Sequence, residues 1–291
     1  MLSRRQLLKS AIAVTAPRLL RAQEHLSDKL TVLDGGGVNV IAFSGSDGII
    51  LIDSGVPKQG DRLKSSLNGK ITTVINTHYH SDHTGNNEMF GVAGAKIIAH
   101  RRTKEWMSTD YWVPLEERYE KARPKAAWPT ETFLLTGSLK SGGEQIDYGH
   151  LTLAHTSGDI YIYFRNANVL AVGDVVSPVL DPSLDYYTGA WIGGRVDAMD
   201  DLLRLANDQT KIVPGCGPVM TKAQLKAERD MMDTLRDRLF KTVREGDGPK
   251  EMLQAGVMKD LPRTWKDPEK FLYAAAKGLW AHHDKIDPNV V

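Results

Sequence analysis

Four side chains that bind metal ions lie within six consecutive positions of the sequence, at His78, His80, Asp82 and His83. Imidazole nitrogens and carboxylate oxygens are the ligand set of zinc and similar borderline ions. A single loop histidine is more often a solvated polar residue, but three histidines and an aspartate at this spacing favour metal binding. Alternation along an extended segment predicts His78, His80 and Asp82 on one side, with a bend that brings His83 beside them, which suits two adjacent ions.

The cluster follows an apolar run at 73–75 and precedes a small, polar run, so we predict a loop at the C-terminal end of a strand. Asp53, His155, Asp174 and Cys216 stand at the ends of other apolar runs. This repetition indicates that distant strand ends converge on one cleft, where catalytic residues are commonly placed. The predicted strands cover residues 30–33, 38–43, 48–53, 70–76, 96–100, 151–155, 160–164, 168–174 and 211–213.

Helical patterns fill much of the remaining chain. Pro57 is well placed near the start of a helix predicted over 56–67. Thr221 and Gln224 form a capping-box signature that opens an amphipathic helix to about residue 244. The other predicted helices are 101–108, 197–207 and two further segments beyond residue 249. These C-terminal helices are expected to pack on the rest of the chain, and they could also mediate a homodimer.

Residues 110–130 break the alternation of strands and helices with a run of aromatic and proline residues, among them Tyr111, Trp112 and Trp128. These side chains could cover one edge of the core. They could also form a lid beside the metal cluster, because active-site covers are drawn from long irregular segments. The sequence leaves both interpretations open.

The composition limits the classes of function. With 291 residues, of which 41% are hydrophobic, the chain can build one large α/β domain or two smaller ones. Residues 1–22 carry five basic residues and no acid, and removing them changes the formal charge from +1 to −4. A mildly acidic chain without a basic stripe argues against nucleic-acid binding, and no apolar run is long enough to cross a bilayer. The single cysteine, Cys216, excludes an intrachain disulfide.

The N-terminal segment resembles a twin-arginine export signal. Arg4 and Arg5 precede a short, modestly apolar stretch at 10–16, and the signal is predicted to span residues 1–22. The alternative is a basic leader without an export function. Export would place the protein in the periplasm or outside the cell, and metal could be loaded first because this route carries folded proteins.

The motifs occur in the order found in the metallo-β-lactamase superfamily of metal-dependent hydrolases, which the chain resembles over roughly residues 30–220. They are Asp53 after an early strand, His78-x-His80-x-Asp82-His83, His155 before a glycine turn, Gly173-Asp174 and Pro214-Gly-Cys216-Gly-Pro218. The resemblance implies an α+β fold, a four-layer αββα sandwich of two face-to-face sheets with helices outside. The hydrolase domain would span 28–222, and 223–291 would be a C-terminal helical extension packed on it.

The resemblance also implies ligands for two ions, expected to be zinc, with iron or manganese as alternatives. Those of the first ion are His78, His80 and His155. Those of the second are Asp82, His83 and Cys216, with Asp174 bridging both ions as in the glyoxalase-like branch. Asp53 would support the ligands by hydrogen bonding. Cys216 departs from the family pattern, where histidine is usual, but a thiolate can bind zinc at about 2.3 Å.

The chemistry implied by the resemblance is hydrolysis of a small molecule. Two ions about 3.5–4 Å apart can lower the pKa of a shared water towards about 7, so that a metal-bound hydroxide cleaves an ester, thioester, lactone or lactam-type bond. Asp82 or Asp174 would take up the proton. One alternative is a β-lactamase, although class B enzymes place their zinc-binding cysteine where Asp174 stands. The others are a mono-iron persulfide dioxygenase-like oxidoreductase and a non-catalytic metal-binding protein.

Overall fold

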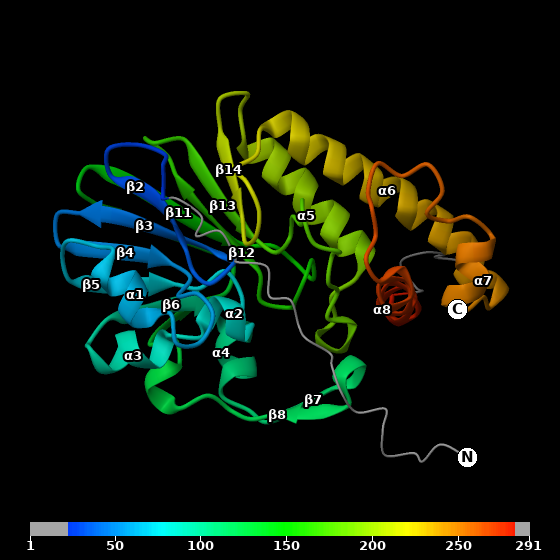
Figure 1. Cartoon of the computed structure of the whole chain (residues 1–291), viewed down its shortest axis with the longest axis horizontal. Coiled ribbons are helices and arrows are strands. Elements are labelled where there is room, and N and C mark those ends of the chain that lie inside the picture. The colour runs from blue at the N-terminus through cyan, green and yellow to red at the C-terminus, as the bar shows by residue number, and fades with distance from the viewer. Residues whose placement is uncertain (1–22, 283–291) are drawn as a thin grey trace, which may run out of the picture.

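The computed structural model describes residues 23–282, so the predicted export signal at 1–22 lies outside the described residues. Most strands form two sheets that lie face to face (Figure 1). The first sheet contains, in spatial order, β1 (Glu24–His25), β2 (Leu30–Asp34), β3 (Asn39–Gly45), β4 (Gly48–Ile52), β5 (Ile71–Ile75), β6 (Lys96–His100) and β9 (Glu131–Phe133). The second contains β10 (Thr136–Ser141), β11 (Glu144–His150), β12 (Ile160–Phe164), β13 (Val169–Gly173) and β14 (Lys211–Pro214). A separate hairpin contains β7 (Tyr111–Val113) and β8 (Arg118–Glu120).

Each sheet changes from antiparallel to parallel pairing, and the parallel part positions the predicted ligands. In the first sheet β4, β5, β6 and β9 are parallel, and in the second β13 and β14 are parallel. The carboxyl ends of parallel strands meet at one edge of a sheet. Asp53 directly follows β4, His78 follows β5, Asp174 follows β13 and Cys216 follows β14.

Helices cover the outer faces of both sheets (Figure 1). They are α1 (Gly60–Ser65), α2 (Ser81–Thr84), α3 (Asn87–Val92), α4 (Arg101–Met107), α5 (Ile192–Leu205), α6 (Lys222–Glu245), α7 (Pro249–Gln254) and α8 (Pro268–Ala281). Short 3₁₀ turns occur at η1 (Pro114–Glu116), η2 (Lys125–Ala127) and η3 (Tyr186–Thr188). Helix α1 begins later than predicted and α5 begins earlier. Between residues 23 and 282, no helix combines the length and apolar character needed to cross a bilayer.

The core is divided into layers by the alternation of side chains along the strands. On β3, Ile41 and Phe43 pack between the sheets, whereas Val40 and Ala42 pack outward with Leu63 of α1. Strand β13 likewise divides its residues between the inter-sheet core and the core beneath α5 and α6. Period-two alternation therefore gives each sheet two apolar faces, which must be covered on both sides. The predicted α+β, four-layer αββα sandwich is confirmed.

The C-terminal helices extend the helical layer over the second sheet. Helix α6 begins with the predicted capping box, in which the Thr221 hydroxyl accepts from the Gln224 N–H and the Gln224 side chain accepts from the Thr221 N–H. Helix α6 packs beside α5, and α8 buries Phe271, Leu272 and Leu279 in the same apolar cluster. Residues 222–282 are therefore packed onto the sandwich by apolar burial.

One predicted strand is wrong. Residues 151–159, where a strand ending in His155 was expected, form a loop between β11 and β12. The Asp159 carboxylate accepts the backbone N–H groups of His155 and Thr156 and the Thr156 hydroxyl. Leu153 also adopts a left-handed conformation, with φ of 52°. These local bonds replace the ladder that a strand would form, and they turn His155 towards the metal cluster.

Two histidines link the sheets at a site away from the predicted ligands. His100, at the end of β6, stacks on His150, at the end of β11, with ring centroids 3.9 Å apart and ring planes 6° apart. Their Nε2 atoms donate to the carbonyls of Leu134 and Ser157. Burial and the like charge of His150 lower the pKa of His100 to about 4, and burial also lowers the pKa of His150.

We expect the free energy of unfolding to fall as the pH is lowered from about 6.5 to about 4, because the unfolded histidines bind protons there and the folded pair does not. Above pH 6.5 the contribution is fully present. Urea unfolding at stepped pH would measure it. His150→Phe keeps a stacking ring but removes one titrating group. Its free energy of unfolding should therefore fall by about 1 kcal/mol less than that of the wild type over this pH range. Equal pH dependence in both proteins would contradict this account.

Candidate metal centre

Three histidines place one ring nitrogen each around a common point. Nε2 of His78 lies 3.1 Å from Nδ1 of His80, which lies 3.0 Å from Nε2 of His155. His78 and His80 follow β5, whereas His155 comes from the loop before β12. A tetrahedral ion with zinc–nitrogen bonds of about 2.0–2.1 Å separates its ligand nitrogens by about 3.3 Å. The spacing therefore suits a single small ion.

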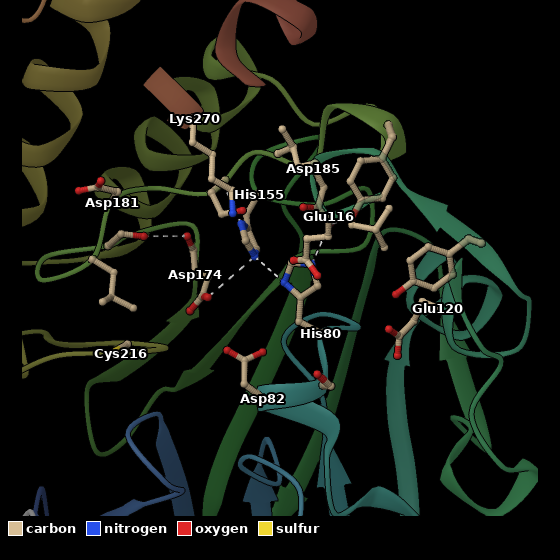
Figure 2. Close-up of a pocket in the computed structure, with 18 of the residues that line it drawn as sticks. His80, Asp82, Glu116, Glu120, His155, Asp174, Asp181, Asp185, Cys216 and Lys270 are labelled. Carbon is tan, nitrogen blue, oxygen red and sulfur yellow. Dashed lines mark hydrogen bonds and ion pairs between the residues drawn. The ribbon is translucent and has the colours of Figure 1, made fainter. Parts of the chain in front are cut away.

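A second group lies beside the first. His78, His83 and Asp174 each offer a ligand atom, and these atoms lie within 4.8 Å of one another. Nε2 of His83 is 3.3 Å from Oδ1 of Asp174, and Oδ2 of Asp174 is 3.9 Å from Nε2 of His155. Asp174 therefore stands between the two groups. Figure 2 shows His80, His155 and Asp174 facing one another across the cavity.

A buried carboxylate orients two of the histidines. Oδ2 of Asp53 accepts from Nδ1 of His83 at 2.7 Å and from the Thr77 hydroxyl at 2.8 Å. Since the Thr77 hydroxyl donates to Asp53, it accepts from Nδ1 of His78 at 3.0 Å. Both imidazoles therefore carry a proton on Nδ1, and both turn Nε2 towards the cavity.

The other two histidines are oriented from the loop between β13 and α5. Nε2 of His80 donates to Oδ2 of Asp185 at 2.8 Å, and Nδ1 of His155 donates to the Ser183 carbonyl at 2.9 Å. All four imidazoles therefore donate outward to fixed acceptors and leave the opposite nitrogen facing inward. Outer partners of this kind fix the ring orientation and the tautomer of metal-binding histidines.

Acidic neighbours of the cluster favour positive charge on two of its four rings. Burial and three neighbouring imidazoles hold the pKa of His78 well below its usual range. Burial opposes protonation of His80 as well, but the Asp185 carboxylate outweighs it and raises the pKa to about 9. Asp174 and Asp53 likewise outweigh burial and raise the pKa of His83 well above its usual range. The two rings with acidic partners therefore carry positive charge, and a metal must displace a proton from each to bind.

Two further features, at His83 and at Gly215, also fit a bound metal ion. Nε2 of His83 is buried and has no hydrogen-bond partner among residues 23–282. Buried polar atoms are rarely left in this state unless an ion or water completes them. A Cβ atom on Gly215 would lie 2.0 Å from Oδ1 of Asp174 and 2.8 Å from Cε1 of His83. Glycine at position 215 therefore leaves the space beside Asp174 and His83 free of side-chain atoms.

Asp82 and Cys216, also predicted as ligands, lie near the cluster but outside both ligand groups. Because Ser81–Thr84 forms helix α2, the expected alternation of His78, His80 and Asp82 along one extended segment is wrong. Oδ2 of Asp82 is 3.9 Å from Nε2 of His83, and its side chain is 46% exposed. The Cys216 thiol lines the same cavity and donates to the Gly37 carbonyl at 3.2 Å.

Asp185 is a site residue that was not predicted from the sequence. It lies in an irregular loop with no strand or helix pattern, so no periodicity marks it. Besides His80, Oδ2 of Asp185 accepts from the hydroxyls of Tyr79 and Tyr187. Burial raises the pKa of this carboxyl, but His80 overrides the effect and lowers the pKa overall. Its role depends on a contact between residues 105 positions apart.

The cavity at the cluster has a volume of about 340 Å³. The segment around the β7–β8 hairpin supplies one wall, with seven residues that were assigned either to a lid or to the edge of the core: Tyr111, Val113, Leu115, Glu116, Arg118, Glu120 and Arg123. Tyr111 and Trp128 also pack against buried Tyr79. Both interpretations therefore apply, because the segment covers a small apolar cluster and lines the cavity.

Asp185→Asn should weaken metal binding by about 10- to 100-fold with little effect on the fold, because the amide keeps the shape and loses the charge. Competition with a chromophoric chelator measures the affinity. Asp181→Asn is the matched control, since Asp181 lines the cavity but, among residues 23–282, accepts only from the N–H groups of Lys266 and Asp267. Equal affinity in the two variants would contradict the orienting role of Asp185.

Cys216→His should retain or raise the metal content, because imidazole is the usual ligand at this position in the resembling family. Cys216→Ala should reduce a two-ion protein to about one ion per chain if the thiolate is a ligand. Elemental analysis of both variants beside the wild type gives the stoichiometry. Loss of both ions from Cys216→His would contradict the assignment of this position to the second site.

Comparison with known proteins places the chain among metal-dependent hydrolases. Metallo-beta-lactamase IND-1 of Chryseobacterium indologenes is 24% identical over 155 residues, which cover 53% of this chain and 59% of that enzyme. 2,4-dinitroanisole O-demethylase subunit alpha of Nocardioides sp. (strain JS1661) is 25% identical over 261 residues, covering 86% of this chain and 70% of that subunit. The structure of the sec-alkylsulfatase Pisa1 from Pseudomonas sp. matches with a TM-score of 0.64 at 14% identity, over 92% of this chain and 51% of that one.

These similarities differ in what they establish. The alkylsulfatase likeness shows the fold alone, and the chain spans only 59% of the length of IND-1. The model of the family described as "Metallo-beta-lactamase superfamily" matches residues 33–216, well over half of the chain, and ends before α6. That range contains the two ligand groups described above. The chain therefore belongs to the metallo-β-lactamase superfamily, as a metal-dependent hydrolase with a histidine-rich metal site.

Proposed function

We propose that the protein is a zinc-dependent hydrolase that cleaves an ester, thioester, lactone or lactam-type bond in a small organic molecule. The observation that carries this proposal is the arrangement of four imidazoles, three of them buried and His80 partly exposed. Their outward nitrogens are all bonded to fixed acceptors and their inward nitrogens converge beside Asp174. Neutral imidazole and carboxylate in this arrangement are the donor set of a catalytic zinc site.

The proposed ligands follow from the two groups. His78, His80 and His155 hold one ion, and Asp174 contacts both positions. The second position uses His83 and Asp82, with Cys216 as a thiolate in place of the usual histidine. For this the Cys216 side chain has to leave the Gly37 carbonyl. We expect zinc at both positions, and iron and manganese are the alternatives that elemental analysis would detect.

In the proposed hydrolysis the imidazoles would bind the ions and the carboxylates would transfer the proton. Bound zinc lowers the pKa of water and polarises the scissile carbonyl. The four imidazoles would be occupied as ligands, whereas each carboxylate beside them has a second oxygen that could take up the proton. Burial raises the pKa of Asp174, but His83 and the neighbouring rings lower it well below the usual range, so this carboxylate is ionised. It is one of two candidate proton acceptors. Asp82, exposed at the cavity floor, is the second acceptor.

β-Lactam hydrolysis is a second candidate, supported by the similarity to IND-1. The ligand pattern argues for a broader hydrolase, because class B enzymes carry cysteine where this chain has Asp174 and histidine where it has Cys216. We therefore place β-lactams beside esters, thioesters and lactones as test substrates. We further propose that residues 1–22 direct export through the twin-arginine route, so that the enzyme acts in the periplasm or outside the cell.

Purified mature protein should contain zinc and should hydrolyse at least one member of a panel of nitrocefin, thioesters, lactones and carboxylic esters. His78→Ala and His155→Ala should each lower kcat/KM by at least about 1000-fold, since each removes a ligand. Metal-replete protein that is inactive on the whole panel would favour a non-catalytic metal-binding role. One iron per chain with oxygen consumption on persulfides would favour oxidation instead.

A further inference from the structure

The C-terminal extension supplies one charged side chain to the metal cavity. Lys270 lies in the first turn of α8, where the Asp267 side chain caps the helix by accepting from the Lys270 N–H. Its side chain lines the cavity together with His155 and Asp174, and Figure 2 shows it directed into the cavity on the side of His155. The family model ends at residue 216, so this contribution is a property of the extension.

The position of Lys270 is held by apolar packing. The next two residues, Phe271 and Leu272, and then Ala275 are buried in the cluster beneath α5 and α6. With this face of α8 buried, Lys270 lies on the side that lines the cavity. Two further contacts fasten the start of the helix, because the Asp181 carboxylate accepts from the N–H groups of Lys266 and Asp267.

Lys270 differs from the other cations of the cavity wall. Arg118 pairs with Glu116 and Glu120, and Arg123 pairs with Glu120, so both guanidinium charges are balanced. Within residues 23–282 the Lys270 ammonium makes no ion pair or hydrogen bond. Asp181 also lines the cavity, but its oxygens are more than 4 Å from that ammonium. The side of the cavity nearest α8 therefore presents an unpaired positive charge.

Behind Lys270 a smaller compartment of about 180 Å³ opens between the 181–184 loop and α8. Five of its nine lining residues are apolar, Asp181, Ser183 and Asp267 are polar, and Lys270 is shared between it and the metal cavity. The apolar lining residues are Leu115, Pro182, Leu184, Phe271 and Ala274. An ammonium at such a junction can bind a charged group while the apolar part of the same molecule is removed from water.

We propose that Lys270 selects the substrate, by binding an anionic group that the substrate carries close to its scissile bond. The substrate is then an organic anion whose apolar portion enters the compartment beside α8. This assignment rests on the proposed hydrolase function for the choice of bond. It makes Lys270 a specificity-determining residue supplied by a helix outside the family region.

Two matched pairs of probes test the assignment on the zinc-loaded protein. The substrates are the 4-nitrophenyl esters of glutaric acid, an anion at neutral pH, and of methyl glutarate, which is neutral. The ligands are hexanoate, an anion, and 2-heptanone, its neutral analogue; neither has a hydrolysable bond, so calorimetry compares binding without any reaction. Lys270→Ala should weaken binding of the anionic ligand and lower kcat/KM for the anionic ester by about 10- to 100-fold, mainly through KM, and leave both neutral probes within about 3-fold.

Two variants on α8 control for structural effects. Lys270→Arg should retain most of the preference for the anion, because the charge remains. Lys277→Ala removes a lysine of the same helix whose Nζ lies 5.4 Å from the Tyr273 ring centroid and which does not line the cavity. It should behave as wild type in every assay. Thermal unfolding of all variants separates lost recognition from lost folding.

The outcomes distinguish the two proposals. A wild type that binds both ligands equally, or a Lys270→Ala change that affects anionic and neutral probes alike, overturns the recognition by Lys270 even if hydrolysis is found. Selective binding of the anion that disappears in Lys270→Ala, in a protein that hydrolyses nothing, supports recognition and overturns the hydrolase proposal. Increasing salt should raise KM for the anionic ester in wild type and leave it unchanged in Lys270→Ala.

Discussion

The metal centre depends on one buried carboxylate that is held in an unfavourable backbone conformation. Asp53 has φ of 63°, a region that costs most non-glycine residues about 1–3 kcal/mol. Three bonds to its side chain, from the Thr77 N–H, the Thr77 hydroxyl and His83, stabilise this conformation. Through them, one residue after β4 orients both His83 and His78, which follow β5. The parallel pairing of β4 with β5 is what brings these groups within reach of one another.

The opposite side of the centre is held by the loop between β13 and α5, and this loop depends on the C-terminal helices. The Ser183 carbonyl, which accepts from His155, is also contacted by buried Arg195 of α5. Arg263 donates to the Ser177 carbonyl and pairs with Glu228 of α6. A buried ion pair adds little net stability, but it positions its partners strongly because an unpaired buried charge is costly. The C-terminal extension therefore helps to position the loop that carries Ser183 and Asp185, the hydrogen-bond acceptors of His155 and His80.

The sequence predicted the parts of the fold and site that depend on local patterns. Alternation of apolar residues predicted most central strands, and the capping box predicted the start of α6. The convergence of Asp53, His78 and Asp174 on one cleft followed from their positions at the ends of predicted strands, whereas the parallel pairing of those strands is a finding of the structure. The loop at 151–159 was not predicted, because its conformation depends on hydrogen bonds from Asp159 that no hydrophobic pattern reveals. Short apolar runs do not distinguish a strand from a loop closed in this way.

The unpredicted residues share a physical cause. Asp185 and Lys270 have no motif, and each acts on the centre across a long separation in sequence. Asp185 contacts His80 because the loop between β13 and α5 lies beside the end of β5. Lys270 lines the cavity because α8 packs against that loop. Such contacts come from tertiary packing, which also decides which of many surface acids and lysines face a cavity. Residues shared across the family region can specify the metal chemistry, while substrate choice can vary with the helices and loops packed around it, as expected when function is carried by sites on a common fold.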